Sequence, residues 1–142
     1  MFYFISTLGH VESTAQMLRL GANPNIQDRK GRTPAHCAAS KGQFEAMKIL
    51  ESNNADFWMS NVRGDLPLHD AVHSGRKDLV RWLLKMKPDG VNAGNQDGKC
   101  PLHIAALNNN VEMCKVSFMS QVVLRHLYSD LTLTTFIGIL PL

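Results

Sequence analysis

The sequence is poor in several features that mark well-known classes of protein. It contains only three cysteines, Cys37, Cys100 and Cys114, and no Cys-x-x-Cys pair. This number and spacing argue against a disulfide framework or a zinc ribbon and favour a reducing compartment. Lys and Arg exceed Asp and Glu by only three, which is far from the dense basic surface of most nucleic-acid-binding proteins. We therefore expect no nucleic-acid partner.

Long apolar stretches are also lacking. The stretch from Leu131 to Leu142 is 12 residues long, whereas a transmembrane helix needs roughly 18 to 20. The apolar start, Met1 to Ile5, has neither a basic n-region nor a small-x-small cleavage pattern. These absences predict that the chain does not span a membrane and is not secreted, so the cytoplasm, or the nucleus, is its expected location.

The composition is that of a folded domain. With 142 residues, of which 44% are hydrophobic and 19% are charged, the chain can bury one core but hardly two. We expect one domain and a monomer.

One short pattern recurs three times along the chain. Glycine, proline, histidine and alanine hold the same places in each copy, and the histidines are 33 and 34 residues apart. The extra residue fits an insertion near 87–90, which a loop accommodates at little cost. A regular period of this length indicates stacked structural repeats. The copies are Gly31-Arg-Thr-Pro34-Ala-His36-Cys-Ala38, Gly64-Asp-Leu-Pro67-Leu-His69-Asp-Ala71 and Gly98-Lys-Cys-Pro101-Leu-His103-Ile-Ala105.

Each copy carries the signals for two helices. In the first copy Thr33 can cap a short helix that starts at Pro34, and Gly42 can end it. Small residues such as Ala38 and Ala39 on this helix allow a neighbouring helix to approach closely. A second helix follows, because apolar residues recur three to four positions apart. These residues are Phe44, Met47 and Leu50 in one unit and Leu79, Trp82 and Leu83 in the next.

The Pro-x-His-x-Ala signature at this period resembles the ankyrin repeat. The resemblance implies an all-α solenoid of helix-turn-helix units joined by hairpin loops. Leu66 and Cys100 replace the capping threonine, and Asn109 replaces the terminating glycine, so these units should be less stable than consensus units. Within the repeat region 9–115, the expected units are the first, partial unit 9–28, the complete second and third units 29–61 and 62–94, and the incomplete fourth unit 95–115.

The pattern fails at both ends. The first unit needs two small residues where the chain has Ile5 and Ser6, so its first helix is expected to be replaced or missing and segment 1–8 to be irregular. No leucine run or Gly-Ala-Asp turn follows Lys115, so 116–142 is expected to be a non-repeat extension with an irregular helix and tail. Helical spacing predicts that the second helix of the last unit is prolonged through Val116, Met119, Val123 and Leu127.

No constellation for catalysis or metal binding stands out. Equivalent histidines in stacked units are about 8 to 10 Å apart, too far for two rings to share an ion. The resemblance implies that His36, His69 and His103 each bond backbone within their own turn. Cys37 is next to His36 in sequence, but neighbours on a helix do not face each other. We therefore predict no enzyme activity, no metal or other cofactor, no small-molecule substrate, and structural cysteines.

The resemblance also places candidate binding residues. In ankyrin repeats the hairpin tips and the exposed side of the first helix form a concave face that binds another protein. Four of the five such positions in the second unit are cationic, which favours an acidic or phosphorylated segment as partner. A basic edge that only serves solubility is the alternative. The candidates are Arg29, Lys30, Arg32, Ser40 and Lys41 in the second unit, Val62, Arg63, Asp65, His73 and Ser74 in the third, and Gln96, Asp97, Lys99, Leu107 and Asn108 in the fourth.

The sequence thus predicts a non-catalytic protein-interaction module, a scaffold or adaptor. The irregular ends motivate an alternative, in which the chain is a truncated or alternative product of a larger ankyrin protein, marginally stable and without independent activity. A further hypothesis, attachment to a membrane surface, rests on the apolar tail at 129–142.

Overall fold

The computed structural model describes residues 11–125, and their side chains as far as residue 119. The described residues form α-helices and one short 3-10 helix without any strand, which confirms the expected all-α fold. The elements are α2 (Val11–Arg19), α3 (Pro34–Lys41), α4 (Phe44–Ser52), α5 (Pro67–His73), α6 (Lys77–Met86), η1 (Pro88–Asn92), α7 (Pro101–Leu107) and α8 (Val111–Arg125).

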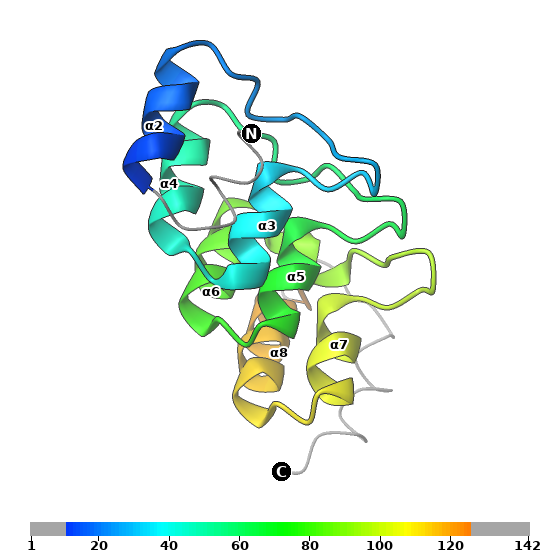
Figure 1. Ribbon diagram of the computed structural model, residues 1–142. Helices are drawn as coiled ribbons and strands as arrows, with labels where there is room; N and C mark the ends of the chain where they lie inside the picture. The colour runs from blue at the N-terminus through cyan, green and yellow to red at the C-terminus, as the bar shows by residue number, and fades with distance from the viewer. Residues whose placement is uncertain (1–10, 126–142) are drawn as a thin grey trace.

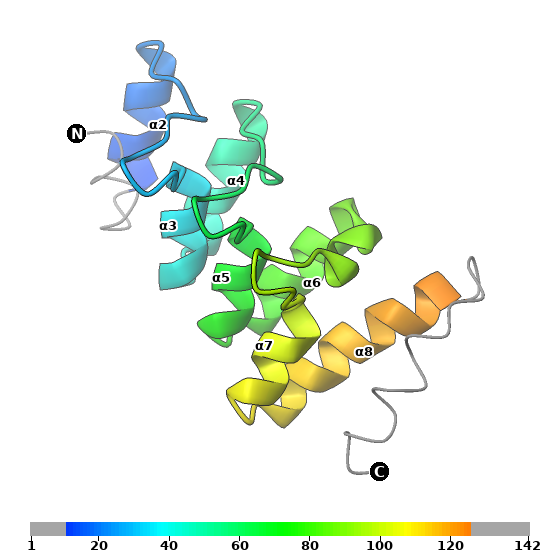
Figure 2. The same cartoon turned by 90° about the vertical axis from the view of Figure 1, so that its right-hand side faces the viewer.

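The helices stack in two rows (Figures 1 and 2). The first helices of the units, α3, α5 and α7, pack one on the next and are called the inner helices below. Their partners α4, α6 and α8 form the outer row, and α2 packs on α4 at the N-terminal end. The hairpin loops project on the side of the inner helices (Figure 1). This arrangement is the predicted solenoid.

The inner helices start and stop where the local sequence predicts. The Thr33 hydroxyl accepts a hydrogen bond from the His36 N–H at 3.4 Å, with Pro34 in the first position of α3. Gly42 ends this helix at a φ of 67°, a left-handed conformation that glycine adopts without steric cost. Leu66 gives α5 no side-chain cap, as expected from the loss of the threonine hydroxyl. Asn109, at a φ of 51°, takes the left-handed position expected of glycine.

The apolar core lies between the two rows. Met47 and Leu50 of α4 and Leu79 and Leu83 of α6 are buried, which confirms the predicted apolar face of each outer helix. Phe44 and Trp82 are half-buried at its edge, and their rings meet edge to face with centroids 5.4 Å apart. These large side chains join α4 to α6.

The structure corrects one local prediction and confirms another. The insertion near 87–90 does not form an irregular loop: Pro88–Asn92 is the 3-10 helix η1, whose Val91 is fully buried. Helix α8 continues to Arg125, which confirms the predicted prolongation through Val116, Met119 and Val123; Met119 is 61% exposed on it.

The predictions for segment 1–8, for the missing first helix, for Leu127 and for the tail at 129–142 lie outside the described residues. Within 11–125, no helix combines the length and the apolar character that crossing a bilayer requires.

Candidate functional site

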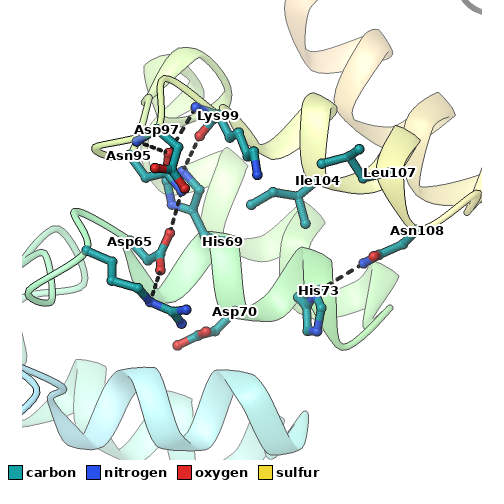
Figure 3. A pocket seen from close by; sticks show the side chains of 11 residues that line it. Asp65, His69, Asp70, His73, Asn95, Asp97, Lys99, Ile104, Leu107 and Asn108 are labelled. Carbon is teal, nitrogen blue, oxygen red and sulfur yellow. Dashed lines mark hydrogen bonds and ion pairs between the residues drawn. The ribbon is translucent and has the colours of Figure 1, made fainter.

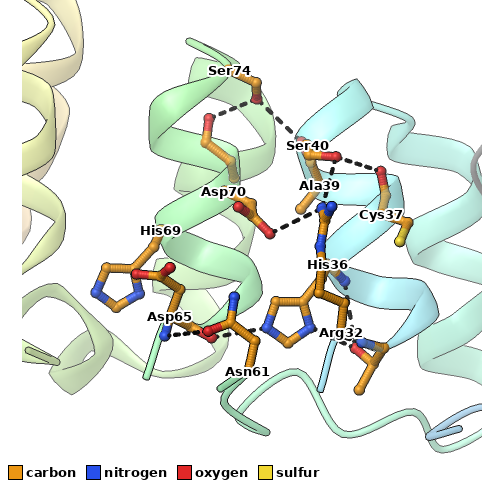
Figure 4. Close-up of polar contacts among 12 residues, drawn as sticks. Arg32, His36, Cys37, Ala39, Ser40, Asn61, Asp65, His69, Asp70 and Ser74 are labelled. Carbon is orange, nitrogen blue, oxygen red and sulfur yellow. Dashed lines mark hydrogen bonds and ion pairs between the residues drawn. The ribbon is translucent and has the colours of Figure 1, made fainter. Parts of the chain in front are cut away.

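A buried histidine near the start of α3 and of α5 joins one unit to the next. His36 Nδ1 accepts a hydrogen bond from the Thr33 N–H at 3.1 Å, and its Nε2 donates to the Asp65 carbonyl of the following unit at 2.9 Å (Figure 4). His69 Nε2 lies 2.9 Å from the Ala93 carbonyl at the end of its own unit and 3.2 Å from the Lys99 carbonyl of the following unit. Burial lowers the pKa of both histidines, so both rings are neutral at pH 7. The predicted bonds within the turn are confirmed, but the prediction missed those between units.

The described cysteines are packed in the interior. Cys37, Cys100 and Cys114 are all buried and none forms a disulfide. The Cys100 thiol lies 3.0 Å from His103 Nδ1, in the place that the Thr33 hydroxyl takes in the second unit. Burial raises the pKa of the Cys114 thiol, which keeps it protonated. Among residues 11–125, no group of three or more His, Cys, Asp or Glu side chains could hold a metal ion.

Most of the candidate binding residues are accessible. Eleven of the fifteen are exposed, Arg32, Ser40 and Ser74 are half-buried, and Asp65 is buried. Arg29, Lys30 and Lys41 are exposed and take part in none of the ion pairs found within the described residues. The second unit therefore presents three cations to solvent.

Asp65 does not occupy the exposed position that the resemblance implies. Its residue exposure is 8%, and its carboxylate accepts a hydrogen bond from the Asn95 amide at 2.9 Å. The other carboxylate oxygen is 3.4 Å from Arg63 Nε. The side chain turns inward because the next hairpin and Arg63 both supply donors, so Asp65 supports the hairpins.

Arg32 is held by a residue that the sequence analysis missed. Its Nη2 lies 3.3 Å from the Ser40 hydroxyl and 3.5 Å from Asp70 Oδ2 (Figure 4). Burial raises the pKa of Asp70 to about 6, although the Arg32 cation acts in the opposite direction. Asp70 follows the repeat histidine, where the other units have Cys37 and Ile104. A carboxylate at a position that is otherwise apolar was the signal that could have identified it.

The half-buried serines also make bonds within the stack. Ser40 donates to the Cys37 carbonyl at 3.0 Å within α3. Ser74 donates to the Ala39 carbonyl at 3.1 Å and thereby joins α5 to α3. Their hydroxyls are already used in the free protein.

A groove of about 340 Å³ opens on the concave face between the third and fourth units (Figure 3). Arg63, Asp97 and Lys99 line it from the hairpins, and Leu107 lines it from the end of α7. His73 of α5 bonds to the Asn108 amide at 3.2 Å. The structure thus brings together seven of the candidate residues, Arg63, Asp65, His73, Asp97, Lys99, Leu107 and Asn108, and adds His69, Asp70, Asn95 and Ile104, which the sequence analysis did not select.

Comparison with known proteins accounts for the stacked helix pairs and the hairpin loops. Residues 2–97 match a family of ankyrin repeats in three copies, and residues 97–116 match a further ankyrin repeat. The chain belongs to the ankyrin repeat family. Ankyrin repeats generally mediate interactions between proteins, and the prediction made from the Pro-x-His-x-Ala pattern is confirmed.

Several relatives are much longer ankyrin-repeat proteins. The chain is 34% identical to dog inversin over 101 residues, which are 70% of the chain and 9% of inversin. It is 34% identical to the human transient receptor potential cation channel subfamily A member 1 over 89 residues, 63% of the chain and 8% of the channel. It is also 34% identical to Xenopus laevis neurogenic locus notch homolog protein 1 over 106 residues, 74% of the chain and 4% of that protein. The chain therefore spans less than a tenth of the length of these three relatives.

The ankyrin register shows how chemistry changes across the concave face. Residues one repeat apart lie at equivalent places on successive units. The row Lys30, Arg63 and Asp97 changes from cation to anion, and the row Ser40, His73 and Leu107 changes from polar to apolar. The ankyrin face is thus cationic at its second unit and mixed, with an apolar wall, at its fourth.

Proposed function

We propose that this chain is a non-catalytic interaction module that binds an acidic or phosphorylated protein segment on its concave face. The observation that carries the proposal is the group of exposed cations Arg29, Lys30 and Lys41, which join no ion pair within the described residues. Carboxylates and phosphates are the natural partners of such groups, and complementary charge gives specificity and fast association. Arg32 would add to this surface once it exchanges Asp70 for the partner.

Three further features support this proposal. The family acts through protein interactions, and the groove lies on the same face as the cations, as the place of its lining residues in the ankyrin register indicates. The three buried, unbridged cysteines are typical of a reducing compartment, so we place the protein in the cytoplasm or nucleus. We expect it to act as a monomer, without a cofactor or a small-molecule substrate.

The experiment is affinity capture from cell lysate with the intact chain and two variants of equal charge change. Arg29→Glu with Lys30→Glu reverses two cations of the concave face. Lys77→Glu with Lys85→Glu reverses two exposed cations of the outer helix α6 and is the control. A parallel lysate treated with phosphatase separates phosphorylated from acidic partners.

A protein retained by the intact chain and the control, and lost from the concave-face variant, supports the proposal. Retention by all three proteins, equal loss from both variants, or no capture by the intact chain contradicts it.

A further inference from the structure

The cationic surface of the second unit and the groove make different demands on a partner. The second unit offers the exposed cations Arg29, Lys30 and Lys41. The groove, in contrast, has Ile104 and Leu107 on one side, and Leu107 is 68% exposed. An exposed leucine beside a half-buried isoleucine leaves apolar surface in water, which a partner's apolar side chain can cover.

The charges that line the groove largely compensate one another. Arg63 Nε lies 3.4 Å from Asp65 Oδ2, and Arg32 Nη2 lies 3.5 Å from Asp70 Oδ2. The remaining charged residues, Asp97 and Lys99, have opposite signs. The groove therefore has no excess charge that would select an ionic group. The feature that can select a partner group is the apolar surface of Ile104 and Leu107.

The repeat geometry sets the distance between the two surfaces. Equivalent positions in neighbouring units are about 10 Å apart. Ile104 and Leu107 belong to the fourth unit, two units from the second, so they lie roughly 20 Å along the stack from the hairpin of the second unit by this spacing. An extended peptide advances about 3.3 Å per residue, so about six residues cover that distance.

We infer that the partner is an extended segment with an acidic or phosphorylated residue over Arg29 and Lys30 and an apolar side chain, about six residues along, in the groove against Ile104 and Leu107. This inference rests on the proposed function and gives the partner a second chemical requirement. The exposed cations of the second unit bind the anionic residue, and burial in the groove binds the apolar side chain. The protein therefore recognises the segment at two separate points.

The test selects binding peptides from a random library, so it does not require the natural partner to be identified. A phage library of random 12-residue peptides is enriched on the intact chain, and a recovered peptide is synthesised for binding measurements by fluorescence anisotropy. We expect the recovered sequences to share Asp or Glu about six residues from Leu, Ile, Met or Phe. Recovered sequences without this pair, or no recovery above background, would overturn the inference.

Matched variants locate the two contacts. Leu107→Ser is expected to weaken binding by about five- to tenfold, because the apolar contact is lost. Met119→Ser is its control, since Met119 is 61% exposed on α8 and does not line the groove. Arg29→Glu with Lys30→Glu is expected to weaken binding by about tenfold, with Lys77→Glu and Lys85→Glu as control.

A peptide whose apolar residue is replaced by alanine is expected to bind the Leu107→Ser variant and the intact chain equally well. Equal effects of Leu107→Ser and Met119→Ser would overturn the inference while leaving the proposed function in place, provided that the Arg29 and Lys30 reversal still weakens binding. If that reversal also had no effect, the proposed function would fail as well.

Discussion

The inner and outer helices stabilise the stack by different means. Inner helices are short, begin at proline and carry small residues, and His36 and His69 bond to the backbone of the next unit. Outer helices contribute large apolar side chains that are fully buried, such as Met47 and Leu83. The difference teaches that directional hydrogen bonds align neighbouring units, whereas apolar burial between the two rows, to which Leu68 and Leu102 of the inner helices also contribute, supplies most of the free energy that keeps them together.

The largest expected effect tests the outer row. Leu83→Ala should lower the free energy of unfolding by about 2 to 5 kcal/mol, because it leaves a cavity at a fully buried position. Urea unfolding followed by circular dichroism measures this loss. Met119→Ala, at a 61% exposed position of α8, is the control and should change stability by less than about 0.5 kcal/mol. Similar effects for both variants would contradict the assigned role of the outer core.

The next effect tests the hydrogen bonds of the inner row. His69→Ala leaves the Leu66 N–H and the carbonyls of Ala93 and of Lys99 in the next unit without their imidazole partner, and should cost about 2 to 3 kcal/mol. The measurement is again the urea transition. His73→Ala, at an exposed histidine of the same helix, should be close to neutral. If the two variants unfolded at the same urea concentration, the inter-unit bond would contribute little to stability.

A smaller, pH-dependent effect is expected at the buried carboxylate of the inner row. Burial raises the pKa of Asp70 from 3.8 to about 6, so the folded state binds this proton more tightly than the unfolded state does. The resulting stabilisation is complete below pH 3.8 and is lost as the pH rises through about 6. Asp70→Asn should therefore gain stability relative to the unmodified chain between about pH 4 and about pH 7.5, by about 1 to 2 kcal/mol after a discount for the solvent that reaches this half-buried group.

The measurement is a series of urea transitions at several pH values. The buried histidines titrate in the opposite sense, but they are present in both proteins and cancel in the difference. Asp97→Asn, at an exposed carboxylate, is the control and should follow the unmodified chain at every pH. A gain for Asp70→Asn that did not grow with pH would show that its carboxylate is not the titrating group.

The smallest expected effect concerns the helix caps of the inner row. Leu66→Thr should restore the side-chain cap of α5 and stabilise the protein by about 1 kcal/mol. Thr33→Leu, the reverse exchange in α3, should cost a similar amount. Both are read as shifts of the urea midpoint at constant slope. A loss of stability in Leu66→Thr would indicate that the leucine packs better than the hydroxyl caps.

Features encoded within a few residues were predictable from the sequence. The start of α3 at Thr33 and Pro34 and its end at Gly42 depend only on local backbone chemistry. The buried faces of α4 and α6 follow from their apolar spacing. Each unit of a stack packs on neighbouring units of the same kind. Repetition of these local signals at one period was therefore enough to predict the solenoid fold.

Features that depend on contacts between units were not predictable in the same way. Asp65 was placed on the surface by its repeat position, but its partner Asn95 is 30 residues away and turns it inward. The contact of Arg32 with Asp70 likewise crosses from one unit to the next. Much of the groove's chemistry was found because its hairpin residues share a register, whereas Ile104 and Asp70 lie on helix positions that the family pattern does not mark as binding.

The acceptors of the histidine bonds have a consequence for how such a chain can change. His36 and His69 donate to main-chain carbonyls of the next unit, at Asp65 and Lys99. Every amino acid supplies the same carbonyl, so the junction places no demand on the identity of the residue that provides it. Units can therefore be exchanged, duplicated or given new loop sequences while the hydrogen bond between histidine and carbonyl is kept. The binding specificity of the array can thus change independently of its architecture.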